Sequence, residues 1–308
     1  MRKADVDSYQ AVARFEALLR RVLRWELRGQ FARHWITQGL GPLYDEIETR
    51  IDIERHHGLY DAGSSILSYL DLRDLLDLIF VRYWSDTFKT VFVGRGTLRR
   101  DFYRIAAVRN KVAHFRPVSA VDGEFLQICG DLYATVSHHY AGSNQTLAYL
   151  SGEPEQVEDQ MDPAAQEQLK QACIEHDLPS LWDEYTRLEA VRAQGLSPGF
   201  GLTKTHVFYE LFTAGSFRGD MFVSWLRKRE AEITFVVVGH AASFVRVFIP
   251  AVLGEQEVKK LLRAFTNVAR ESNSDVERRP DDVAEDFDVG SLEMLVAYGH
   301  NAEVGFAF

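Results

Sequence analysis

The segment Arg109–His114, with the sequence Arg-Asn-Lys-Val-Ala-His, contains two side chains that can act together on a phosphate diester. The guanidinium of Arg109 carries a fixed positive charge and a planar fork of donors that matches phosphate oxygens. The imidazole of His114 suits proton transfer, because histidine ordinarily titrates at about pH 6.5. RNA is cleaved when its own 2'-hydroxyl attacks the adjacent phosphate, which requires proton transfer and cations near the phosphate oxygens. The pair is therefore either an ordinary solvated helix end or a set suited to proton transfer and charge stabilisation at an RNA phosphate.

Helix geometry constrains how these residues can meet. At about 100° per residue, Asn110 and His114 lie about 40° apart, so the amide of Asn110 can orient the imidazole. Arg109 and His114 lie about 140° apart on the same count. The arginine must therefore reach round the helix or meet a histidine from another chain. Because a two-fold dimer would bring two copies of each residue into one cleft, we expect a composite site in a homodimer.

Charge is distributed unevenly along the chain. The formal net charge is -10, which argues against binding of nucleic acid by the whole surface. Seven basic residues and a single acid, Asp101, nevertheless lie between Arg95 and Arg116. The segment is either an ordinary solvated face or an RNA track whose expected contacts are Arg99, Arg100, Arg104, Lys111 and Arg116. The range Glu153–Glu189 is the opposite, with eleven acids against Lys170 and Arg187.

Apolar periodicity predicts an all-α region around the motif. We expect helices from Ser8 to Gly29, from about Ser64 to Tyr83, through Phe88–Phe92, from Thr97 to near His114, and from Ser119 onward. Pro117 disfavours a helical Arg116, which places the end of the motif helix close to His114. The pattern predicts a bundle of four main helices in residues 1–145.

The segment Val108–Pro117 resembles the R-N-x-x-x-H signature of the HEPN superfamily, particularly bacterial members whose motif helix ends in His followed closely by Arg-Pro. The resemblance covers residues 60–140 well, residues 8–59 only by helix pattern, and nothing past 150. It includes an apolar helix with internal acids ending at Trp84, a short Phe-rich helix, the motif helix and a Ser-initiated last helix, in the order of the family.

This resemblance implies an antiparallel helical bundle that dimerises and cleaves RNA without a metal. Arg109, Asn110 and His114 would form the catalytic set, and Asp74 corresponds to a helix-two acid that faces the site in many members, although its spacing equally suits a surface position. The implied setting is anti-phage defence or toxin-like growth arrest. An alternative from a different class is a non-catalytic HEPN module that binds RNA or protein and retains the motif for phosphate contact.

The rest of the chain combines helix-like and strand-like patterns, so the predicted fold class is α+β overall. We expect an acidic helical connector in residues 146–198, with helices starting at Asp162–Pro163 and running from Ser180 to Gly195. Residues 199–308 then form a small α+β domain that senses a trigger or regulates the bundle. Its predicted elements are strands at Ile233–Val238 and Phe244–Ile249, a helix through Val258–Val268, a mobile loop at Ser272–Asp288, and a hairpin of Leu292–Tyr298 and Val304–Phe308.

Several classes are disfavoured by what the sequence lacks. Two cysteines, Cys129 and Cys173, exclude a disulfide framework and a four-cysteine zinc site, and we expect neither metal nor cofactor. No apolar run approaches the roughly 20 residues that a membrane helix needs, so we expect a cytoplasmic protein without membrane contact. The expected partners are RNA, a second copy of the chain, and a phage-derived or antitoxin-like protein regulator bound through residues 199–308.

Overall fold

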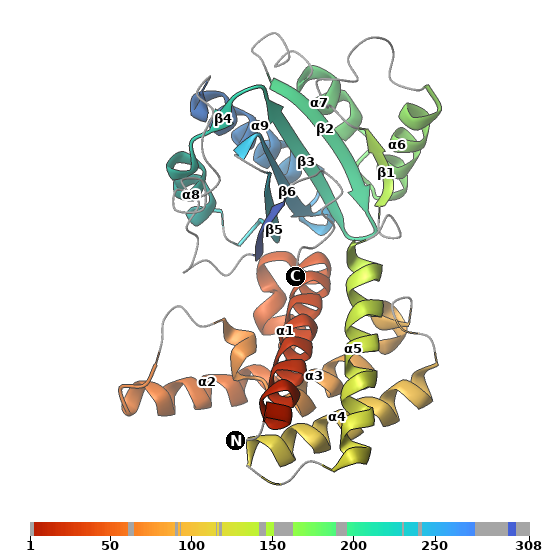
Figure 1. Cartoon of the computed structure of the whole chain (residues 1–308). Coiled ribbons are helices and arrows are strands. Elements are labelled where there is room, and N and C mark those ends of the chain that lie inside the picture. Colours follow the sequence, from red (N-terminus) through yellow and green to blue (C-terminus); the bar gives the residue numbers. More distant parts are fainter. Residues whose placement is uncertain are drawn as a thin grey trace. The chain divides into compact units, whose positions relative to one another are not determined.

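The computed structural model describes residues 3–60, 65–89, 92, 94–114, 116, 119–141, 146–150, 163–188, 196–229, 231–239, 242–274 and 295–299. These residues fall into two compact units. The helical unit comprises the residues up to Glu26 together with Ile36–Tyr140, and the sheet unit comprises Leu27–Trp35 and the residues from Ala141. The fold class is α+β with a helical N-terminal region, as predicted (Figure 1).

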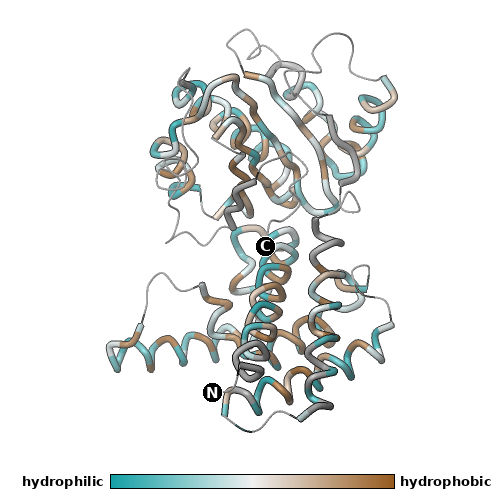
Figure 2. Tube along the Cα trace, viewed as in Figure 1, coloured by the Kyte–Doolittle hydropathy of each residue, from teal (hydrophilic) through white to brown (hydrophobic). Residues whose placement is uncertain are grey.

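Helices make up all the regular structure described in the helical unit. Its α-helices are α1 (Lys3–Phe31), α2 (Pro42–His56), α3 (Leu72–Asp77), α4 (Arg95–Ala113) and α5 (Ala120–Ala141). Between them lie the 3-10 helices η1 (Ala32–His34) and η3 (Ile66–Tyr69) and the π-helices η2 (Trp35–Gly39), η4 (Leu78–Arg82) and η5 (Trp84–Phe88). Hydrophobic and hydrophilic residues alternate along these helices, as amphipathic helices require (Figure 2).

Aromatic side chains form the centre of this unit. Phe15 of α1, Phe80 of η4 and Phe102 of α4 are fully buried, and the Phe102 ring lies 5.1 Å from each of the other two rings between centroids. Tilted and edge-on contacts of this kind add to the free energy gained from burying the rings. Because α4 contributes Phe102 to this core, the helix that carries the motif is firmly placed.

The predicted helix from Ser64 to Tyr83 is interrupted in the structure. Leu70 is extended, with ψ 131°, and Asp71 begins α3 with a capping box in which its side chain accepts from the Asp74 amide and Asp74 accepts from the Asp71 amide. An aspartate that satisfies the first free amides of a helix favours a start at that position. The predicted range therefore contains a 3-10 turn, a short α-helix and one π-helical turn rather than one helix.

Other helix boundaries also differ from the sequence pattern. α1 continues past Gly29, where a Cβ atom would lie 2.7 Å from the Cβ of Thr205, so this glycine allows close packing rather than ending the helix. α2 occupies part of the range 31–58 that lacked a clear pattern. The predicted start of the last helix is confirmed, since Ser119 immediately precedes α5 and its hydroxyl accepts from the Asp122 amide.

The sheet unit contains a six-stranded sheet in the order β1-β2-β3-β6-β5-β8. Its strands are β1 (Thr146–Leu150), β2 (Leu196–Thr203), β3 (His206–Thr213), β5 (Phe235–Gly239), β6 (Phe244–Pro250) and β8 (Leu295–Gly299). Neighbours are antiparallel except β5 and β8, which are parallel. A second pair joins β4 (Ser216–Phe217) to β7 (Asn273–Ser274).

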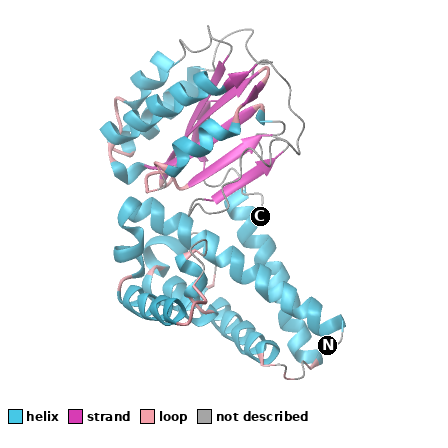
Figure 3. Ribbon diagram, turned by 90° about the vertical axis from the view of Figure 1, so that its left-hand side faces the viewer, coloured by secondary structure: helices cyan, strands magenta, loops and turns pink. Residues whose placement is uncertain are grey.

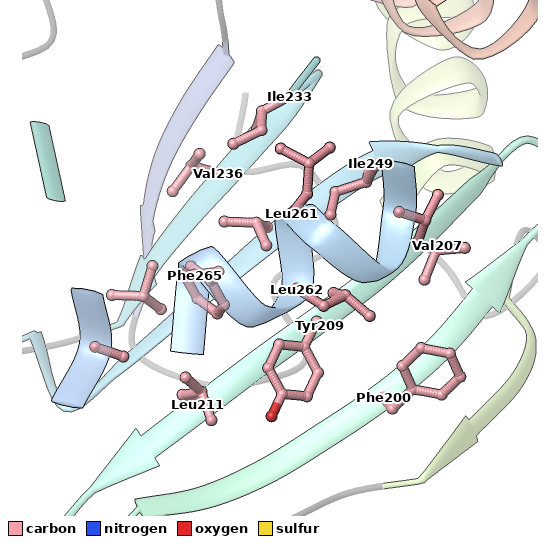
Figure 4. Packing of buried hydrophobic residues seen from close by; sticks show 14 of the residues in the cluster. Phe200, Val207, Tyr209, Leu211, Ile233, Val236, Ile249, Leu261, Leu262 and Phe265 are labelled. Carbon is pink, nitrogen blue, oxygen red and sulfur yellow. The ribbon is translucent and has the colours of Figure 1, made fainter. Parts of the chain in front are cut away.

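One face of the large sheet packs on helices, as the turned view shows (Figure 3). These helices are α6 (Pro163–Glu175), α7 (Leu181–Leu188), α8 (Gly219–Arg227) and α9 (Glu255–Ser272). In the core, Leu261 and Phe265 of α9 face Tyr209 of β3 and Val236 of β5 (Figure 4). Alternate residues of a strand point to opposite faces, so Val207, Tyr209 and Leu211 belong to this core.

The sheet unit begins earlier than the sequence suggested. α6 and α7 were expected in a connector, yet Leu169, Cys173 and Leu181 are fully buried in the same core as the sheet. Glu167, Glu175 and Asp183 are exposed on these helices, whereas Glu184 of α7 is 4 % exposed and pairs with Arg263 of α9. The structure therefore divides the chain near residue 140 and differs from the expected divisions at 146 and 198.

Some of the elements predicted in the sheet unit are present in the structure, and others differ or lie outside the described residues. β5, β6 and α9 confirm the predicted strands and helix. β8 matches part of Leu292–Tyr298, but its described partner is β5 in parallel, and Val304–Phe308 lies outside the described residues. Residues 275–288 of the predicted mobile loop, and the predicted helix ends at Asp162 and Gly195, also lie outside them. Sequence analysis missed β1, β2 and β3.

Candidate active site

The motif helix α4 is positioned by its buried side. Phe102, Ile105 and Val108 are at most 2 % exposed, while Arg100, Arg104 and Asn110 are exposed. Gly94, with φ of 78°, precedes the helix in a conformation that favours glycine. The helix ends at Ala113, as predicted, and His114 forms a turn whose amide donates to the Asn110 carbonyl at 3.2 Å.

Arg109 continues the core-facing side of α4 and meets an acid there. Its Nε donates to Oε1 of Glu16 on α1 at 3.0 Å, and its Nη1 donates to the Asn110 side-chain oxygen at 3.4 Å. The arginine side chain is 35 % exposed and that of Glu16 10 %. Arg109 is thus fixed on one edge and open to solvent on another.

His114 and Asn110 are both exposed at the end of α4. We expected the Asn110 amide to orient the imidazole, but its oxygen accepts from Arg109 instead. The expected arrangement assumed a helical His114, whereas His114 lies in the turn after the helix has ended. Within one chain, the structure therefore brings Arg109 and Asn110 together, and His114 stands at the exposed helix end.

Asp74, the expected helix-two acid, has other partners. Its Oδ2 accepts from Arg50 of α2 at 3.0 Å and from the Asp71 amide at 3.1 Å. The bond from Asp71 is part of the capping box that starts α3, and the bond from Arg50 ties α3 to α2, so Asp74 has a structural role in its own segment. The acid that lies against Arg109 is Glu16, which sequence analysis missed.

A signal for Glu16 was present in the sequence. At about 100° per residue, Glu16 lies about 40° from Val12 and about 20° from Leu23, inside the apolar stripe of α1. An acid in such a stripe needs a cationic partner, because burying an unpaired charge is costly. Arg109 was the partner to look for.

Lys111 forms an ion pair that spans the turn containing His114. Its Nζ contacts both oxygens of Asp122 at 2.7 and 2.9 Å, and the Ser119 amide and hydroxyl each donate to Oδ2 at 2.8 Å. Donation from Lys111 and Ser119 holds the pKa of Asp122 at about 2. Lys111, expected to contact phosphate, thus joins the end of α4 to the start of α5.

The other expected RNA contacts are exposed on the outside of the unit. Arg100 and Arg104 lie on one stripe of α4, about 40° apart on a helical count, while Arg109 lies about 180° from Arg100. Arg99 lies over the Tyr103 ring at 5.6 Å, and Arg100 contacts Asp101 at 3.5 Å. Arg116 is exposed beyond the helix. The structure therefore leaves Arg100 and Arg104 exposed on α4 and His114 exposed in the turn that follows the helix.

No protein-family model, curated protein or solved structure matches the chain. Within the described ranges, no group of three His, Cys, Asp or Glu residues is arranged to hold a metal ion. No helix in that part of the chain is both long and apolar enough to cross a membrane.

Proposed function

We propose that the helical unit is a metal-independent endoribonuclease of the HEPN type that acts as a homodimer. His114 transfers protons to or from the reacting oxygens, and Arg109 stabilises the negative charge that grows on the phosphate. Asn110 steadies the guanidinium of Arg109, and Arg99, Arg100, Arg104 and Arg116 bind the RNA backbone. The observation that carries this proposal is an exposed imidazole in the turn after a helix whose exposed residues include Arg100 and Arg104.

The position of Arg109 supports a composite site. Its guanidinium is directed to Glu16 of α1, whereas His114 is exposed in the turn after α4. A second copy that brings its own motif helix close would pair the open edge of one arginine with the histidine of the other chain. The sheet unit, in this proposal, senses a trigger or binds a phage-derived or antitoxin-like protein. The cellular setting proposed is cytoplasmic anti-phage defence or toxin-like growth arrest, on the resemblance alone.

The first test is cleavage of total RNA by purified protein in EDTA. His114→Ala is expected to reduce cleavage by roughly 10² to 10⁴, the usual contribution of a positioned proton-transfer group. His57→Ala is the matched control, because His57 is an exposed histidine at the end of α2. Products of the wild-type protein should carry 2',3'-cyclic phosphate ends. Equal cleavage by the folded His114→Ala protein would end the assignment.

A mixing experiment tests the composite site. Arg109→Ala and His114→Ala proteins, each inactive alone, are combined under conditions that allow subunit exchange. A heterodimer then contains one cleft with an intact arginine from one chain and an intact histidine from the other, so activity should return. No recovery after verified exchange would place the two residues in the same chain's site.

One observation favours a second candidate, a non-catalytic module that binds RNA or a partner protein. The Nε of Arg109 already has a partner in its own chain, and in this second candidate the motif serves phosphate contact and helix packing without chemistry. Salt-dependent RNA binding with no product from wild-type protein, with and without candidate triggers, would support this candidate.

A further inference from the structure

We infer that Glu16 is a positioning residue for Arg109, which fixes the guanidinium so that its outer edge is presented to an RNA phosphate, with Arg20 keeping the cluster cationic. The inference rests on the proposed function, because it assigns a role within the same site. Glu16 is 7 % exposed and comes from α1, far from the motif in sequence.

The carboxylate of Glu16 is held from two sides. Oε1 accepts from Nε of Arg109 at 3.0 Å, and Oε2 accepts from Nη2 of Arg20 at 3.2 Å. Arg20 is itself anchored, since its Nε and Nη2 donate to the carbonyls of Leu67 and Leu70 at 3.0 and 2.9 Å. The direction of the carboxylate is thereby set by α1 and by the segment at η3, and it sets the plane of the Arg109 guanidinium in turn.

The way Glu16 holds Arg109 leaves the chemically useful edge open. A guanidinium binds phosphate best through two parallel N–H donors. Glu16 takes the Nε donor, and the Asn110 oxygen contacts Nη1 at a long 3.4 Å. The Nη1–Nη2 edge therefore remains for an anion, in agreement with a side chain that is 35 % exposed.

The charge of the cluster also favours an anion. Glu16 paired with Arg109 alone would be neutral, and phosphate would gain little from approaching it. Because Arg20 shares the same carboxylate, two guanidiniums and one carboxylate leave one positive charge. Partial burial strengthens its attraction for phosphate relative to a fully solvated arginine.

The test measures RNA affinity, for which a charge effect and a positioning effect of Glu16 predict changes in opposite directions. Removal of an acid should by charge alone tighten RNA binding. If Glu16 positions Arg109, Glu16→Ala instead weakens binding of single-stranded RNA and lowers kcat/KM by roughly 10- to 100-fold, the cost of losing a charge-assisted hydrogen bond. Glu16→Gln retains an oxygen acceptor for Nε and should recover part of this loss. Affinity is measured across a series of salt concentrations with the full chain.

Controls separate positioning from general destabilisation. Asp77→Asn is the matched variant, because Asp77 also ties α4 to a neighbouring helix, by accepting from the Tyr103 hydroxyl at 2.6 Å, but it does not contact Arg109. Because this variant also removes an acid, charge alone should tighten its binding of RNA slightly, and it should not weaken binding. In a double-mutant cycle, Glu16→Ala added to Arg109→Ala should cause no further loss. Thermal unfolding of each variant shows that folded protein is compared.

The outcomes distinguish this inference from the proposed function. Tighter RNA binding by folded Glu16→Ala and Glu16→Gln, or additive losses in the cycle, would overturn the positioning role while leaving the ribonuclease intact. If wild-type protein binds RNA without cleaving it, the binding arm still decides the role of Glu16 and only the catalytic proposal fails. If wild-type protein neither binds nor cleaves RNA, both are overturned.

Discussion

Each unit of the protein contains a carboxylate–arginine pair between neighbouring elements, and the two pairs differ in what surrounds them. In the helical unit, Glu16 and Arg109 join α1 to α4, and the arginine is 35 % exposed. In the sheet unit, Glu210 of β3 and Arg246 of β6 are register partners, and their side chains are 0 % and 10 % exposed. The first guanidinium can meet a ligand, whereas the second is enclosed.

The ion pair of Glu210 and Arg246 is enclosed by neighbouring residues of the sheet. Nε and Nη2 of Arg246 both contact Oε2 of Glu210, at 2.6 and 2.5 Å, and the guanidinium lies over the Phe208 ring at 5.2 Å. Gly199 on β2 is required there, because a Cβ would lie 2.4 Å from Oε1 of Glu210. The comparison teaches that access of the outer guanidinium edge, rather than the presence of an ion pair, separates a candidate site from structural support.

The largest expected effect is on the enclosed pair. Glu210→Ala should destabilise the sheet unit by about 3–5 kcal/mol, because it leaves Arg246 buried without its carboxylate. Urea unfolding measures the change. Glu210→Leu combined with Arg246→Met should recover much of the loss, since apolar residues of similar volume can replace a buried pair. A loss below about 1 kcal/mol for Glu210→Ala would mean that water reaches Arg246 and that the two pairs are alike.

Acid should weaken the sheet unit first. His206 is fully buried, its ring nitrogens contact the hydroxyls of Thr205 and Thr234, and burial, with a smaller contribution from Arg28, lowers its pKa from 6.5 to about 3. The unfolded chain binds this proton more readily than the folded chain does. The contribution of His206 to the free energy of unfolding is therefore fully present above pH 6.5 and is lost as the pH falls toward 3, by up to about 1.4 kcal/mol per pH unit.

Unfolding measured from pH 7.5 to 4 tests this expectation. His206→Gln cannot titrate and should unfold with a shallower dependence on pH, even if it is less stable throughout. The same slope in both proteins would assign the acid sensitivity to other groups.

The smallest expected effect is on the exposed pair. Arg109→Ala should cost only about 1 kcal/mol of stability, because the pair is partly solvated and Arg20 still compensates Glu16. RNA affinity should nevertheless fall. Thermal unfolding and RNA binding are compared in the same preparation. A stability loss as large as that of Glu210→Ala would make Arg109 a structural residue and remove the contrast between the pairs.

Local signals were sufficient for part of the fold. The end of α4 near His114, the start of α5 after Ser119, and α9 were predicted because caps, prolines and apolar spacing are encoded by neighbouring residues. The same holds for β5, a continuous apolar run, and for β6, an apolar run interrupted only by Arg246; such runs are typical of strands with both faces buried.

Elements and contacts that depend on distant residues were not predicted. β2 includes Pro198, Gly199 and Gly201, which are poor strand formers, and the fit against Glu210 explains Gly199 alone. In the same way, Arg109 and His114 could be found from the motif, but the partner of Arg109 is Glu16, 93 residues earlier in the chain. The angular count placed Asn110 beside His114, whereas the side-chain bond that Asn110 makes in the structure is to Arg109.

The two cysteines allow the opening of each unit to be measured separately. Cys129 of α5 and Cys173 of α6 are buried to about the same extent, and burial is the main cause that raises the pKa of each thiol to about 12. Neither should react with a thiol reagent at neutral pH until its own unit opens. Since one belongs to the helical unit and the other to the sheet unit, the labelling rates of Cys129 and Cys173 report two opening free energies from a single protein without any engineered probe.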